Sequence, residues 1–175
     1  RINNQQPAEL YEALFYKLLK RCKVHSGSHK FRFKNPLYSL DASAINLSLK
    51  LFPWAAHRDD TANVKLSVGL NHSSMIPEFV ALSDGNENDM IEGRKFQFPK
   101  GSIVAFDKGY VDYEWFADLT TQGVSFVTRL RAKAVYEVIQ SHSVTENCGV
   151  ISDETIHLNS AHAEKRGVPQ LRKGA

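Results

Sequence analysis

Apolar residues near the start of the chain recur with the period of a helix. The repeat consists of leucines four positions apart with aromatic residues beside them: Leu10, Leu14, Leu18, Tyr11 and Phe15. This spacing predicts an amphipathic helix over residues 8–20. Pro7 precedes it, where the first turn of a helix tolerates proline. The loop Ser26-Gly27-Ser28 is expected to close this unit.

Shorter apolar runs in the middle of the chain predict β-strands. Residues 37–40, Leu-Tyr-Ser-Leu, predict a short strand, and residues 64–71 alternate between apolar and polar positions. Residues 75–82 predict a third strand, which Pro77 interrupts near its start. Three successive strands with short connections favour an antiparallel meander.

Helices and strands alternate in the next part of the chain. Asp89 is expected to begin one helix, with Glu92 at the spacing of a capping box. Asp112 is expected to cap a second helix, with Gly123 as its C′ glycine, a position that favours positive φ. Two strands are expected to alternate with these helices, at residues 102–106 and 125–131. A meander followed by such alternation indicates an α/β fold with a mixed sheet.

Beyond Lys133 the pattern changes again. Residues 134–140 and 149–158 predict two further strands, and the end of the chain is polar. The chain therefore divides into three expected parts, a helical lead-in over residues 1–30, an α/β core over 31–133 and the start of a β-rich segment over 134–175. Because the chain begins with Arg1 and not with methionine, we expect it to be a piece of a longer protein.

Composition narrows the class of protein. The 175 residues are 42% apolar and 23% charged, as in a globular domain with its own core. The net charge of +3 permits an anionic partner such as nucleic acid. Cys22 and Cys148 lie far apart and indicate a reducing compartment. With no signal peptide and no apolar run of membrane-spanning length, a cytoplasmic location without a membrane partner is expected.

Two of the predicted strands lead directly into an aspartate. Asp41 follows the strand 37–40, and Asp107 follows the strand 102–106. If the strands are neighbours, about 4.8 Å apart, their carboxylates can bind metal ions together. Carboxylate oxygens suit Mg²⁺ or Mn²⁺. The alternative is that both are ordinary turn or cap residues, as most strand-end aspartates are.

Basic residues recur at every second position after residue 125. Arg129, Arg131 and Lys133 would emerge on one face if residues 125–133 form a strand. Such a stripe fits contacts to phosphate groups. A solvated strand face is the alternative.

Other common catalytic patterns are absent from the sequence. His25 and His29 flank a Ser-Gly-Ser loop, and His157 and His162 have no cysteine or acidic partner at zinc spacing. No G-x-S-x-G, Walker or Rossmann motif occurs. These absences argue against hydrolases and nucleotide-binding enzymes of those types.

The order of the motifs resembles a known family. The motifs, in chain order, are Leu40-Asp41-Ala42-Ser43, Phe52-Pro53-Trp54-Ala55, Val64-Lys65-Leu66, Ile76-Pro77, Ser83-Asp84-Gly85 with Asp89, Phe106-Asp107-Lys108-Gly109-Tyr110 and Phe126-Val127-Thr128-Arg129-Leu130. From about residue 8 to its end, the chain resembles the DDE domain of cut-and-paste insertion-sequence transposases of the IS-four group. The resemblance implies an RNase H-like mixed sheet with flanking helices, followed by the start of a β-rich insertion.

The resemblance also implies roles for individual residues. Asp41 matches the first catalytic aspartate, Asp107 the second, and Arg129 an arginine that closes the Phe-Val-Thr-Arg strand. The implied chemistry is two-metal phosphoryl transfer at transposon ends, with Mg²⁺ or Mn²⁺ as cofactor and DNA as substrate. A homodimer in the synaptic complex and association with the nucleoid are further implications. Asp89 is expected to act only as a helix cap, and Trp54 as a core residue.

One part of the family pattern is missing. The third carboxylate belongs to a Tyr-x2-Arg-x3-Glu-x6-Lys signature, and no tyrosine of this chain has arginine three residues on. We therefore expect the third carboxylate beyond Ala175. Glu154 and Glu164 are expected at a strand edge or in a loop and are poor substitutes. The alternatives are an inactive remnant that only binds DNA or full-length transposase, and an unrelated RNase H-like nuclease.

Overall fold

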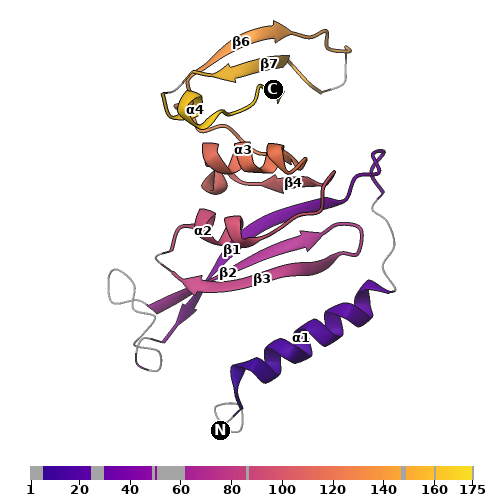
Figure 1. The fold of residues 1–175 in the computed structure, drawn as a ribbon, viewed down its shortest axis with the longest axis vertical. Coiled ribbons are helices and arrows are strands. Elements are labelled where there is room, and N and C mark those ends of the chain that lie inside the picture. The colour runs from indigo at the N-terminus through magenta and orange to yellow at the C-terminus, as the bar shows by residue number, and fades with distance from the viewer. Residues whose placement is uncertain are drawn as a thin grey trace.

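Two sheets and the helices packed around them form the described part of the chain. The computed structural model describes residues 6–24, 30–48, 50, 62–85, 87–146, 149–159 and 161–174. A five-stranded sheet and a three-stranded sheet lie on opposite sides of helix α3 (Tyr113–Thr121) (Figure 1). Trp54, expected in the core, and the Ser26-Gly27-Ser28 loop lie outside the described residues. In the described part, no helix is both long and apolar enough to cross a membrane.

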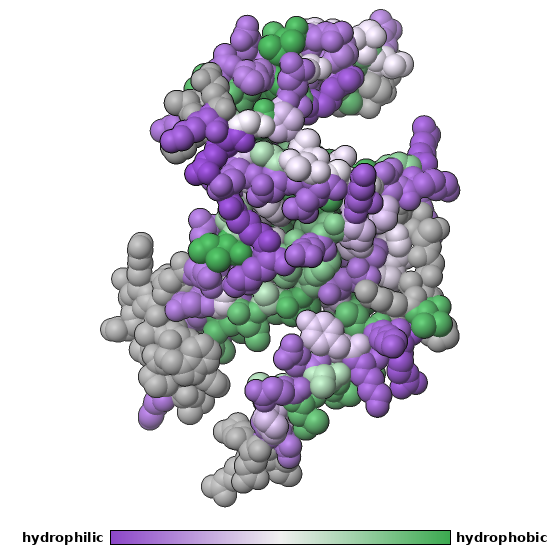
Figure 2. All heavy atoms as spheres, in the orientation of Figure 1, coloured by the Kyte–Doolittle hydropathy of each residue, from purple (hydrophilic) through white to green (hydrophobic). Residues whose placement is uncertain are grey.

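The predicted first helix is confirmed and extends slightly further. Helix α1 (Ala8–Lys23) lies against the edge strand β3 (Ile76–Asp84) of the larger sheet (Figure 1). Leu19 is buried, whereas Leu10, Leu14 and Leu18 remain about half exposed. Apolar surface consequently gathers along β3 and α1 in the space-filling view (Figure 2).

The larger sheet has the strand order β3-β2-β1-β4-β5. Its strands are β1 (Leu37–Leu47), β2 (Ala62–Asn71), β3, β4 (Ile103–Phe106) and β5 (Ser125–Val127). The first three strands pair antiparallel, which confirms the meander, and β4 pairs parallel with both β1 and β5. The sheet is therefore mixed and flanked by helices, as expected of an RNase H-like fold.

Two strands of the larger sheet differ most in length from the prediction. Strand β1 continues past residue 40 to Leu47, because its antiparallel partner β2 extends beside it from Asn71 to Ala62. Strand β5 ends at Val127 and not at residue 131. The backbone then forms a turn in which the amide of Ala134 donates to the carbonyl of Arg131 at 2.9 Å. Pairing with neighbouring strands thus set both lengths, and the local apolar pattern did not.

Local capping defines the helices that follow. Asp112 caps α3 by accepting a hydrogen bond from the Trp115 amide at 2.9 Å, and Gly123 follows the helix with φ of 72°. Both features were predicted. Helix α2 (Asp89–Lys95) begins where expected, but Asn88 is its cap and accepts from the Met90 amide at 3.2 Å. The predicted capping role of Asp89 is therefore wrong.

The core lies between the larger sheet and α3. Phe116 is fully buried and stacks on Phe126 of β5, with ring centroids 4.3 Å apart. Phe106 of β4 packs against Trp115 of α3 at 4.8 Å between ring centroids. Apolar burial of this kind, at about 25 cal/mol per Å², is the main stabilising contribution to a domain of this size. The packing fixes the end of β4 directly before Asp107.

The smaller sheet follows the core in the sequence. Strands β6 (Tyr136–Ser141), β7 (Asp153–Leu158) and β8 (Leu171–Gly174) are antiparallel in that order, and helix α4 (Ala161–Arg166) connects the last two. The first two strands were predicted, whereas α4 and β8 were not. Four residues of this part share the main apolar cluster with the larger sheet: Ile156, Leu158, Ala163 and Val168.

Candidate active site

The two strands that carry the predicted catalytic aspartates are neighbours. Leu40 of β1 is paired with Phe106 of β4 in a parallel ladder, and both side chains are buried. The next residue of each strand is an exposed aspartate, Asp41 and Asp107. The pairing between β1 and β4 ends at this point, so the two acidic residues follow the same rung of the sheet.

Each aspartate is oriented by a nearby backbone amide. Asp41 Oδ1 accepts from the Ala42 amide at 2.9 Å. Asp107 Oδ1 accepts from the Gly109 amide at 2.8 Å and so caps the short 3-10 turn η3 (Lys108–Tyr110). The hydroxyl of Thr128 donates to the Asp107 carbonyl at 3.3 Å. The Oδ2 atom of each carboxylate takes no part in these bonds.

A third carboxylate lies beside the Asp107 turn. A Cβ atom added to Gly109 would lie 2.9 Å from Asp107 Oδ1 and 3.5 Å from Asp89 Oδ2. Asp89 forms an ion pair with Lys65 of β2, 2.8 Å from Nζ to Oδ1, and the same ammonium donates to the Glu87 carbonyl at 2.6 Å. Sequence reasoning missed this arrangement, because Asp89 has the spacing of a helix cap.

The Tyr110 side chain lies within the field of all three carboxylates. Tyr110 is 1% exposed. Burial raises the pKa of its hydroxyl well above the ordinary value, and the charge of Asp89 raises it further. The charges of Asp41 and Asp107 act in the same direction, and the Ser67 hydroxyl offsets part of the effect. Tyr110 is therefore a neutral, buried support of the site.

Helix α2 packs closely against both acidic segments. A Cβ atom added to Gly93 would lie 3.0 Å from Tyr110 Cδ1 and 3.3 Å from Leu40 Cδ2. Leu40 immediately precedes Asp41, and Tyr110 closes the turn that begins at Asp107. The absence of a side chain at Gly93 thus lets one helix contact the supports of both aspartates.

The donor atoms of the two aspartates that follow the Leu40–Phe106 pair suit a divalent cation. Two aspartates on neighbouring strands offer hard oxygen ligands, with one oxygen of each already fixed by a backbone amide. In the described residues, no three acidic, histidine or cysteine side chains converge as a metal cluster requires. Two carboxylates can hold one divalent ion, whereas a pair of ions normally needs a third acidic ligand.

The two other glutamates considered for the third position are differently placed. Glu154 lies on β7, the central strand of the smaller sheet and not an edge, and pairs with Lys173 at 3.0 Å. Glu164 belongs to helix α4 and not to a loop. The predicted settings of these residues were therefore wrong.

The three basic residues do not form a stripe on one strand. Because β5 ends at Val127, Arg129, Arg131 and Lys133 all lie beyond it, and the predicted strand face is wrong. Arg131 and Lys133 line a hollow of about 670 Å³ that reaches Gly109, which we call the α3 hollow. Arg129 lines a separate hollow of about 790 Å³ between β5 and β8.

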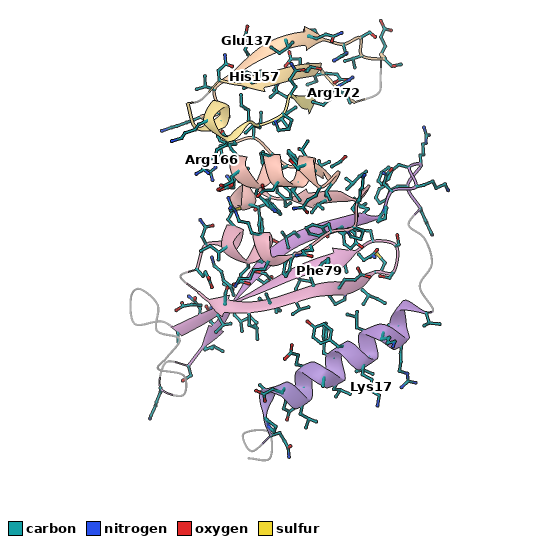
Figure 3. The ribbon with its side chains drawn as sticks, viewed as in Figure 1. Lys17, Phe79, Glu137, His157, Arg166 and Arg172 are labelled. Atoms are coloured by element: carbon teal, nitrogen blue, oxygen red, sulfur yellow. The ribbon has the colours of Figure 1, made fainter. Side chains whose placement is uncertain are left out.

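The α3 hollow is bordered by paired charges. Glu114 of α3 forms ion pairs with Arg94 of α2 at 3.0 Å and with Arg166 of α4 at 2.5 Å. Arg166 lies where α4 meets α3 (Figure 3). The guanidinium of Arg131 donates to the Val111 carbonyl at 3.0 Å, next to the Asp107 turn. The side chain of Arg131 thus connects the turn after β5 to the segment after β4.

Comparison with known proteins identifies the family. Residues 32–173 match the family described as Transposase DDE domain. A protein of Sinorhizobium fredii named as a transposase, y4zB, is 31% identical over 137 residues, which cover 76% of this chain and 38% of that protein. A protein of Geobacillus stearothermophilus, named as a transposase for insertion sequence element IS5377, is 23% identical over 125 residues, 71% of this chain and 33% of that protein.

No solved structure is significantly similar to the chain. The chain spans about a third of the length of these curated relatives. The family match nevertheless covers both acidic segments, the meander and most of the smaller sheet. The chain therefore belongs to the transposase DDE domain family.

Proposed function

We propose that this chain is part of the catalytic domain of a DNA transposase that cleaves and joins strands at transposon ends. The observation that supports this proposal best is the pairing of Leu40 with Phe106, which puts Asp41 and Asp107 on neighbouring strands at one position of the sheet. Membership of the family removes the alternative of an unrelated RNase H-like nuclease. We further propose that the protein works in the cytoplasm on nucleoid DNA.

In this proposal Asp41 and Asp107 hold Mg²⁺ or Mn²⁺ through their carboxylates. A bound divalent ion stabilises charge on phosphate oxygens and activates water or a 3′-hydroxyl group. The amides of Ala42 and Gly109 keep the two carboxylates oriented, so that little reorganisation is needed on binding. No covalent bond between protein and DNA is required.

The basic residues would contact the DNA backbone. Lys133 lines the α3 hollow, which also reaches Gly109, and Arg129 lines the separate hollow between β5 and β8. Contacts to phosphates position a duplex without reading its sequence. We propose that these residues, together with Arg131, guide DNA towards the aspartates, and that a second copy of the protein binds the other transposon end.

The site also needs a third acidic ligand to hold a second ion. We propose that it is a glutamate of a Tyr-Arg-Glu-Lys helix that the longer protein supplies. One observation favours a second candidate function, an inactive DNA-binding remnant: the described residues offer no convergent group of three ligands. The two functions differ in whether the longer coding sequence restores strand cleavage.

Strand cleavage tests the proposal. The 175-residue chain and a version extended by its downstream coding sequence are incubated with transposon-end DNA and Mn²⁺. The extended version is expected to cut and to lose cutting as Asp41→Asn, and the chain alone is not expected to cut. Normal cutting by an extended Asp107→Asn variant would refute the assignment. If the 175-residue chain cuts DNA alone and Glu154→Gln abolishes that cutting, the third carboxylate lies within this chain.

A further inference from the structure

The ion pair between Lys65 and Asp89 lies beside the Asp107 turn, but neither residue belongs to the segments that carry Asp41 and Asp107. Lys65 comes from β2, and Asp89 from the first turn of α2. One Asp89 oxygen faces Lys65 Nζ at 2.8 Å, and the other lies 3.5 Å from the Cβ position of Gly109. Asp107 Oδ1 lies 2.9 Å from that same position. The Asp89 and Asp107 carboxylates therefore flank one glycine.

Both members of the pair are partly shielded from solvent. Their side chains are 23% exposed for Lys65 and 29% exposed for Asp89. Interactions between partly buried charges are screened by salt less than those at an open surface. The buried hydroxyl of Tyr110 experiences the charge of Asp89 together with those of Asp41 and Asp107, so these fields overlap.

We propose that Lys65 and Asp89 tune the affinity of the Asp41 and Asp107 pair for a divalent cation through their charges. This inference rests on the proposed metal binding by those two aspartates. Asp89 adds negative potential at the site and favours the cation. Lys65 neutralises part of that potential and keeps the affinity moderate. Neither residue touches the ion, so both act through the field at the site.

The backbone around Asp89 holds the pair in position. The Asn88 cap fixes the start of α2, and the close contacts of Gly93 with Leu40 and Tyr110 fix its distance from the sheet. The second bond of Lys65, to the Glu87 carbonyl, orients the ammonium. The charge of Asp89 is thereby kept close to the turn that presents Asp107.

The two halves of the pair should have opposite effects on metal binding. If the pair only holds α2 in place, breaking it from either side should weaken binding in the same direction. If its charges matter, Asp89→Asn should weaken binding and Lys65→Met should strengthen it. Coulomb's law for a divalent ion and a charge several ångströms away predicts changes of about fivefold in each direction.

The test is a Mn²⁺ titration of the purified 175-residue chain, with free Mn²⁺ followed by electron paramagnetic resonance. We expect a dissociation constant about fivefold higher for Asp89→Asn and about fivefold lower for Lys65→Met, and both differences should shrink in 1 M salt. Asp89→Glu and Lys65→Arg conserve the charges and should keep the wild-type dissociation constant. The matched control is Lys173→Met, which breaks an ion pair of similar length and exposure in the smaller sheet.

Three outcomes would overturn the inference. They are a change in the same direction for Asp89→Asn and Lys65→Met, no change in either, and an equal change for Lys173→Met. If Asp89→Asn does not fold, as judged by circular dichroism, Lys65→Met alone decides by binding more tightly or not. If the wild type binds no Mn²⁺, or if Asp41→Asn does not reduce the binding, the proposed metal site itself is wrong. This inference then fails with it.

Discussion

Leu40 of β1 and Phe106 of β4 are direct partners in a parallel ladder, and this pairing determines where the two acidic side chains emerge. Both residues are buried in the core beneath the site. The core therefore fixes the strands, and the residues that follow are free to carry chemistry. Asp41 and Asp107 each accept a hydrogen bond from a neighbouring amide through Oδ1, and that bond does not use Oδ2.

Gly109→Ala should impair metal binding more than stability. The new methyl group would lie 2.9 Å from Asp107 Oδ1, closer than carbon normally approaches, so the carboxylate must move and lose its bond to the Gly109 amide. We expect Mn²⁺ affinity to fall by about tenfold, the equivalent of a lost charge-assisted hydrogen bond. Calorimetric titration measures the affinity, and thermal melting provides the control. Unchanged affinity would show that the Asp107 rotamer is irrelevant.

Gly93→Ala should destabilise the fold although alanine is the better helix former. At an unhindered helix position this replacement stabilises by about 1 kcal/mol. Here the methyl group would meet Tyr110 at 3.0 Å and Leu40 at 3.3 Å, both of which are buried. Overpacking costs about 1–3 kcal/mol. We expect the free energy of unfolding to fall by a net value of about 1 kcal/mol, as measured by urea denaturation. A rise would show that α2 can move away from Tyr110 and Leu40.

Arg131 and Lys133 should differ in what they contribute. Arg131→Ala removes the hydrogen bond to the Val111 carbonyl and should lower the free energy of unfolding by about 1 kcal/mol. Lys133→Ala and Arg129→Ala should leave stability unchanged. If Arg129, Arg131 and Lys133 contact phosphates, each alanine variant should weaken DNA binding equally across sequences. Each should also reduce the salt dependence of binding by roughly one unit of slope. Unchanged DNA affinity and slope in all three variants would favour solvated side chains.

Features set by local chemistry could be predicted from the sequence. The cap at Asp112 and the positive φ of Gly123 depend on neighbouring residues alone, and both were found as expected. The strand before Asp107 was also recognisable from its apolar run. Together with the family motifs, these signals were enough for the mixed sheet and for the order of its elements.

Features set by distant partners could not be predicted. Strand β1 extends to Leu47 because β2 runs beside it, and β5 stops at Val127, next to the end of its partner β4 at Phe106. The spacing of Asp89 and Glu92 fits a capping box, but Asn88 caps the helix and Asp89 pairs with Lys65 from another strand. Long-range pairing of this kind leaves no periodic trace in the sequence.

The central claim is that Asp41 and Asp107 share one divalent cation. Mn²⁺ titration of the 175-residue chain tests this claim most directly. The wild type is compared with Asp41→Asn, Asp107→Asn and the double variant, after circular dichroism has shown that all four are folded. We predict weak binding of one ion by the wild type, a loss of at least about tenfold in each single variant, and no measurable binding in the double variant, because the two aspartates are the ligands of one ion. Binding that persists in the double variant would contradict the claim.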